Sequence, residues 1–185
     1  MQRNNNNSRL AGVTLRVVVM ALLVALQIVL SRILSINLPF LKIGFSFLPI
    51  MVAAYIYGPA GGVIVATVSD LIGAITINTQ GTFFPGFTVT AALVGFIYGM
   101  CLRGKISTVK IAVGIVIKEV LCSLVLNTAW LSIMYHSSFG ALAATRIWQV
   151  LAMIVVETVI ADILFNRMTA MKKLRSELNT KYSKK

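Results

Sequence analysis

Acidic residues, histidine and cysteine are scarce in this sequence, and their scarcity argues against several classes of protein. Asp and Glu total 5 against 17 Lys and Arg, and His136 is the single histidine. The two cysteines, Cys101 and Cys122, lie within or beside apolar runs and form no CxxC pair. We therefore expect neither a disulfide framework nor a zinc site. Their expected role is that of small apolar residues in helix packing.

Motifs of catalysis are also missing. The sequence has no GxxxxGK[ST] loop for ATP phosphates, no HExxH pair of metal ligands and no GxSxG nucleophile elbow. We therefore predict a chain that is not an enzyme and that holds neither a metal nor a cofactor.

Charge is sparse and apolar residues dominate. Charged residues make up 12% of the chain, against about 25% in soluble domains, while 58% of residues are hydrophobic. The net charge of +12 raises the question of nucleic acid, but Lys and Arg lie almost wholly in tails and short connections between apolar runs. This distribution predicts an integral membrane protein in a lipid bilayer, with no nucleic-acid partner.

Six apolar runs are candidates to cross the bilayer, which takes about 20 apolar residues. We predict an all-α bundle of six transmembrane helices, although the second and third could form a re-entrant pair. No small-residue cleavage site follows the first run, so we expect a retained helix rather than a signal peptide. The expected divisions are a tail (1–14), a transmembrane domain (15–166) and a basic tail (167–185). The expected spans are 15–33, 45–57, 63–77, 87–102, 111–134 and 147–165.

Lys and Arg also set the expected orientation. With six spans, thirteen of the 17 basic residues fall on the side of the two tails, and Lys118 lies within a span. The positive-inside rule therefore places both termini in the cytoplasm. Three basic residues remain on the outer side, each beside a break between helices: Arg32, Lys42 and Arg146. Converging cations suit a ligand with carboxylates, and the alternative is that they reach lipid headgroups.

Aromatic side chains are expected at the same outer level. Phe83 and Phe84 precede the fourth span and Phe87 begins it, and Trp130 shares a helix face with Asn127. Asn127 can offer a donor and an acceptor to the edge of a heterocycle while aromatic rings cover its faces. The alternative for the phenylalanines is an interfacial aromatic belt.

Four ionisable residues are expected deeper in the spans, where charge is costly. Lys118 and Glu157 fall at similar depth and are expected to pair, with Glu119 next to Lys118 and Asp70 mid-span. One interpretation is a proton relay. The other, which we favour, is a structural ion pair together with a hydrogen-bonded Asp70. Gln149, Met153 and Glu157 follow Arg146 along one stripe of the sixth span.

Small residues recur every four positions on two spans. Ala21 and Ala25 lie on the first, and Ala91, Gly95 and Gly99 on the fourth. Such stripes let helices approach closely, most often for internal packing.

Five short segments are distinctive in combination. They are 36–49 (INLPFLKIGFSFLP), 57–59 (YGP), 69–73 (SDLIG), 83–88 (FFPGFT) and 127–131 (NTAWL). Together they resemble the folate-type substrate-binding subunits of energy-coupling-factor (ECF) vitamin transporters. The resemblance covers about residues 15–165 and includes an AxxxA motif at Ala21 and Ala25.

The resemblance implies a bacterial plasma-membrane subunit with six helices and an outward-facing pocket capped by loops. Such subunits dock on a transmembrane coupling subunit that carries two ATPases, and they topple in the membrane to release vitamin inside. Missing ATP motifs are therefore expected. The resemblance also implies a basic residue three positions after Arg146, where this chain has Gln149. That departure leaves the number of carboxylate contacts open.

These observations predict a high-affinity folate-binding subunit, with Ala21 and Ala25 facing the coupling subunit. One alternative is a subunit of the same type for hydroxymethylpyrimidine, pantothenate or another vitamin. Others are a stand-alone proton-coupled carrier that uses Asp70 and Glu157, or a small membrane enzyme or scaffold. The candidate folate contacts are Arg32, Lys42 and Arg146 for carboxylates, Phe83, Phe84, Phe87 and Trp130 for stacking, and Asn127 for the pterin edge.

Overall fold

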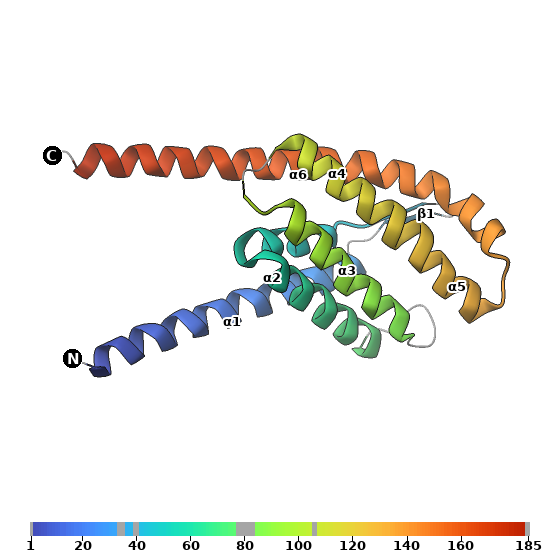
Figure 1. Ribbon diagram of the computed structural model, residues 1–185, viewed down its shortest axis with the longest axis horizontal. Coiled ribbons are helices and arrows are strands. Elements are labelled where there is room, and N and C mark those ends of the chain that lie inside the picture. The colour runs from blue at the N-terminus through green and yellow to red at the C-terminus, as the bar shows by residue number, and fades with distance from the viewer. Residues whose placement is uncertain (1, 33–35, 39–40, 77–83, 105–106, 184–185) are drawn as a thin grey trace.

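The computed structural model describes the backbone of residues 2–32, 36–38, 41–76, 84–104 and 107–183, and the side chains of residues 12–31, 44–76, 84–104 and 107–167. Within these ranges the fold is helical, as predicted, apart from connections and one short ribbon (Figure 1). The helices are α1 (Gln2–Arg32), α2 (Phe47–Thr76), α3 (Pro85–Cys101), α4 (Thr108–Lys118), the π-helix η1 (Glu119–Leu126), α5 (Asn127–Tyr135) and α6 (Phe139–Ser183).

An antiparallel ribbon lies between α1 and α2. Strand β1 (Ile36–Leu38) pairs with β2 (Leu41–Ile43), so that Ile36 lies opposite Ile43. The sequence predicted only a break between helices here, because three-residue strands are too short to display a period of two.

The helices carry apolar side chains outward as well as inward. In the described part of the chain, three helical segments are long and apolar enough to cross a membrane: Gly12–Ser31, Phe47–Thr76 and Phe139–Arg167. Pro85–Cys101 is also apolar but shorter. Large exposed side chains include Leu22, Ile64, Phe96 and Val155. An outer surface of this kind suits lipid rather than water.

Helix α2 contains both the second and the third predicted spans. Gly58 interrupts its helical geometry with φ 73° and ψ −164°, and Pro59 follows. Glycine adopts a positive φ without the penalty that a side chain brings. The fixed φ of proline suits the first turn of the helical half that follows. The turn predicted over 58–62 is thus confined to one residue, and Gly61 and Gly62 are helical.

Helix α6 begins earlier than the sequence predicted. It starts at Phe139 rather than near 147, so Arg146 lies inside the helix and not beside a break. Ala141, Ala143 and Ala144 precede Arg146, and alanine is the strongest helix former. The helix also continues through the predicted tail to Ser183. In Figure 1 both ends of the chain extend past the bundle on the same side.

Glycines set the closest approach between α2 and α3. A Cβ atom at Gly62 would lie 2.5 Å from the Gly95 carbonyl oxygen, and one at Gly99 would collide with the backbone of Pro59. The stripe at 91, 95 and 99 therefore serves internal packing, as predicted. Helix α1 instead packs on α2 through Val24, which is buried with Ala53 and Val65.

A single helical run positions much of the interior. Helices α4, η1 and α5 follow one another without a break (Figure 1). The main hydrophobic core joins this run to α2, α3 and α6. It includes Phe47, Met51, Tyr98, Ile115, Ala161 and Phe165.

Candidate ligand-binding site

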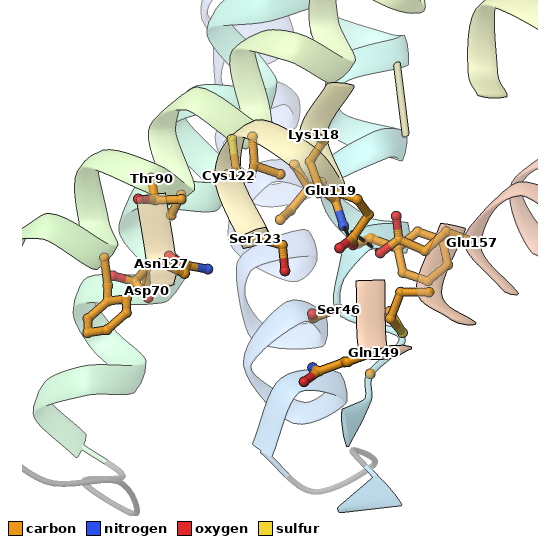
Figure 2. Close-up of a pocket in the computed structure, with 17 residues that line it drawn as sticks. Ser46, Asp70, Thr90, Lys118, Glu119, Cys122, Ser123, Asn127, Gln149 and Glu157 are labelled. Atoms are coloured by element: carbon orange, nitrogen blue, oxygen red, sulfur yellow. Dashed lines mark hydrogen bonds and ion pairs between the residues drawn. The ribbon is translucent and has the colours of Figure 1, made fainter. Parts of the chain in front are cut away.

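A cavity of about 300 Å³ opens between α2, α3, the continuous run of α4, η1 and α5, and α6 (Figure 2). Its volume is at the lower end of the range for small-molecule sites in proteins. The lining mixes apolar side chains with polar and ionisable ones. The polar and ionisable lining residues are Ser46, Asp70, Thr90, Lys118, Glu119, Ser123, Asn127, Gln149 and Glu157.

A buried ionic cluster forms one side of the cavity. Lys118 Nζ contacts Glu119 Oε1, and it lies 2.6 Å from Glu157 Oε1. Tyr98 donates its hydroxyl to Glu157 Oε2 at 2.9 Å. Lys118, Glu119 and Glu157 are 8%, 3% and 1% exposed, so water does not screen their charges. The predicted pairing of Lys118 with Glu157 is confirmed, and Glu119 joins it.

Asp70 lies on the other side of the cavity and is held by a neighbouring helix. Thr88 of α3 donates its hydroxyl to Asp70 Oδ2 at 2.8 Å. This bond ties α2 to α3 and supplies the hydrogen bond that the structural interpretation of Asp70 requires. Figure 2 shows Asp70 grouped with Thr90 and Asn127, apart from Lys118 and its two carboxylates.

Aromatic rings stand beside the group that contains Asp70. Phe84 lies 6.0 Å from Phe87 and 5.6 Å from Trp130, measured between ring centroids. Trp130 donates its Nε1–H to Thr90 Oγ1 at 3.0 Å. Of these aromatic residues, Phe87 lines the cavity itself. Phe84 and Trp130 are not among its lining residues, but Phe84 contacts Phe87 and Trp130 contacts Thr90, both of which line it. A Cβ atom at Gly86 would lie 2.6 Å from the Trp130 ring, so this glycine lets the indole approach.

Asn127 also lines the cavity, as its predicted role requires. Its Oδ1 atom is buried and has no hydrogen-bond partner among the described residues. A buried amide oxygen without a partner costs about 1–3 kcal/mol. A ligand that donates a hydrogen bond to Asn127 would remove this cost.

Of the three cationic side chains predicted to contact carboxylates, the structure describes that of Arg146. Arg146 is half-buried and donates from an Nη atom to the Ser123 carbonyl oxygen at 3.4 Å, one turn before the cavity-lining Gln149. It therefore lies beside the cavity, attached to the helical run that carries Asn127. Phe83 and the side chains of Arg32 and Lys42 lie outside the described residues.

For several lining residues the sequence predicted less than the structure shows. Glu119 was expected deep in a span next to Lys118, but the predicted ion pair joined Lys118 to Glu157 alone. Adjacent residues on a regular α-helix do not face each other. The π-helix that begins at Glu119 widens the turn there, and no sequence pattern indicated it. Cys122 was assigned to packing and is indeed buried, but it also lines the cavity. The sequence pattern that did indicate lining residues was the stripe of Gln149, Met153 and Glu157, and all three residues line the cavity.

Comparison with known proteins identifies the family. A profile described as the substrate-specific component of ECF transporters matches residues 15–168. The chain belongs to this family, and is thus a membrane transport component rather than an enzyme. It is 39% identical over 131 residues to "Folate transporter FolT" of Clostridium novyi, covering 69% of this chain and 74% of that protein. It is 35% identical over 162 residues to the protein of the same name from Leuconostoc mesenteroides, covering 83% and 85%.

Solved structures give the same fold. "Crystal structure of FolT bound with folic acid" matches with a TM-score of 0.75 at 28% identity, covering 82% of this chain and 92% of that one. "Structure and mechanism of the S component of a bacterial ECF transporter" matches with a TM-score of 0.61 at 22% identity, covering 86% and 98%. The second likeness concerns the fold alone.

Proposed function

We propose that this chain is the high-affinity folate-binding subunit of an ATP-driven ECF importer in the bacterial plasma membrane. It has six membrane-spanning segments, with α2 counted as two segments on either side of Gly58, and both termini in the cytoplasm. A transmembrane coupling subunit and two ATPases supply the energy. The observation that carries the proposal is a polar, aromatic-flanked cavity in a chain 35–39% identical to two folate transporters.

The cavity offers groups that complement folate end by end. Folate joins a flat pterin, with hydrogen-bond donors and acceptors along its edges, to a glutamate with two carboxylates. Phe87, backed by Phe84 and Trp130, gives an aromatic wall for a ring, and Asn127 gives a buried amide for its edge. Arg146 lies nearer the outer end of α6 than Glu157 does. The glutamate tail therefore lies outward, towards Arg146, Arg32 and Lys42.

The surface that meets the coupling subunit is assigned to α1. Ala21 and Ala25 are both exposed, whereas Val24 of the same helix is buried against α2. The small residues of α3 lie in the contact with α2. The two alanines of α1 are instead exposed, with no other described segment covering them. Two exposed alanines four positions apart form a flat strip on which another helix can pack closely.

Reconstitution tests the proposal as a whole. The parent chain, with coupling subunit and ATPases in liposomes, should accumulate folate on addition of ATP. The chain alone should accumulate none, with or without a proton gradient. Robust gradient-driven accumulation by the chain alone, abolished by Asp70→Asn, would identify a proton-coupled carrier instead.

Variants on α1 test the docking surface separately. Ala21→Trp and Ala25→Trp should leave folate binding by the isolated subunit intact, because neither residue lines the cavity. Each should block co-purification with the coupling subunit and stop ATP-driven uptake. Leu22→Trp is the matched control, because Leu22 is an exposed residue of the same helix whose side chain is already large. Normal uptake in both alanine variants would show that this strip contacts only lipid.

A further inference from the structure

Within the described part of the chain, one oxygen of the buried ionic cluster has no hydrogen-bond partner. Lys118 Nζ contacts Oε1 of Glu119 and Oε1 of Glu157, and the Tyr98 hydroxyl donates to Oε2 of Glu157. Three of the four carboxylate oxygens thus have donors. Glu119 Oε2 is buried and has none among the described residues.

This oxygen belongs to a residue that lines the cavity. Glu119 is 3% exposed, so bulk water cannot solvate it, and it faces the same cavity as Asn127 from a different side (Figure 2). The cluster also sets two carboxylates against one ammonium. A buried carboxylate oxygen without a hydrogen-bond donor costs more free energy than a buried neutral acceptor without one. The cavity therefore has a strong acceptor at this point, and a ligand group with N–H bonds complements it.

We propose that Glu119 is a specificity-determining residue that accepts hydrogen bonds from the amino-substituted N–H edge of a nitrogen heterocycle. The inference rests on the proposed function, in which that edge is the 2-amino group and ring N–H of the pterin. Glu119 can only accept, whereas the amide of Asn127 both donates and accepts. Asn127 therefore contacts another edge of the same ring, and the two residues together fix its orientation.

Glu157 supplies a matched control within the same cluster. It is a glutamate of similar burial that lines the same cavity, but both its oxygens already accept hydrogen bonds from the protein. Replacing it perturbs the cluster without removing an available acceptor. Glu119→Gln and Glu157→Gln therefore differ in ligand discrimination rather than in charge.

The test compares folic acid with its 2-desamino analogue, in which hydrogen replaces the 2-amino group. Both are titrated into the purified full chain by calorimetry. The parent should bind the analogue about ten- to hundredfold more weakly, as expected for a lost hydrogen bond to a charged group. In Glu119→Gln the amide oxygen is a neutral and weaker acceptor, so this ratio should fall to about a fifth of the parent's or less. In Glu157→Gln and Asn127→Leu both affinities fall together and the ratio is kept.

Several outcomes would overturn the assignment. Equal binding of the two ligands by the parent chain would overturn the assignment. This outcome needs no variant, so it does not depend on whether Glu119→Gln folds. A ratio that persists in Glu119→Gln, or that collapses in Asn127→Leu instead, would also overturn it. If the parent binds no folic acid, the proposed function fails and this inference falls with it. If the parent binds folic acid but does not discriminate against the 2-desamino analogue, the inference about Glu119 fails while the proposed function stands.

Discussion

Removal of the Lys118 ammonium is the sharpest structural test of the buried cluster. Lys118→Met keeps most of the length of the side chain but leaves the carboxylates of Glu119 and Glu157 facing each other without a cation. Removing one partner of a buried ion pair costs about 3–5 kcal/mol. For chains of this size a change of 1 kcal/mol shifts the Tm by about 2–4 °C. The expected loss is therefore about 6–20 °C.

Thermal unfolding of the purified chain in detergent, followed by tryptophan fluorescence, measures this loss. Arg103→Met is the control, because Arg103 is exposed and its replacement should change stability by about 0.5 kcal/mol or less. The double variant Lys118→Met with Glu157→Gln should be more stable than Lys118→Met alone, since it removes one of the two unpaired carboxylates. A Tm for Lys118→Met within about 2 °C of the parent would refute the energetic role given to the cluster.

Three further predictions concern the site and its frame. Arg146→Ala should weaken folate binding about ten- to hundredfold, and more than Lys42→Ala does, because a guanidinium on a helix is better placed for bidentate contact; calorimetry measures both. Gly86→Val should displace the indole of Trp130, which shifts its emission and weakens binding; the Trp148→Phe background leaves Trp130 as the single tryptophan. Gly95→Leu should separate α3 from α2 and lower both thermal stability and folate binding, and a variant that keeps both would contradict the packing described.

The sequence was most informative where spacing along a helix decides which residues meet. Residues at intervals of three and four share a helix face, so Gln149, Met153 and Glu157 were predicted together and line one cavity. The pairing of Lys118 with Glu157 followed from their similar depth. Such predictions need only the helix repeat and the expected orientation of the spans.

Features that depend on tertiary packing were beyond the sequence. The π-helix at Glu119–Leu126 changes which side chains face inward, and its residues are ordinary helix formers. Similar small-residue stripes serve different ends: Gly95 is buried against Gly62, whereas Ala21 is exposed. Spacing alone cannot distinguish the two, because the difference lies in which helices are neighbours.

The central claim is that one chain, without partners, binds folate in the cavity between α2, α3, the continuous run of α4, η1 and α5, and α6. Calorimetric titration of the purified chain with folic acid tests it most directly, with hydroxymethylpyrimidine and pantothenate as competing ligands. We expect saturable binding of one folic acid per chain, tighter than about 1 μM, or roughly −8 kcal/mol, and unaffected by either competitor. No heat at micromolar folic acid, or displacement by one of the other compounds, would contradict the claim.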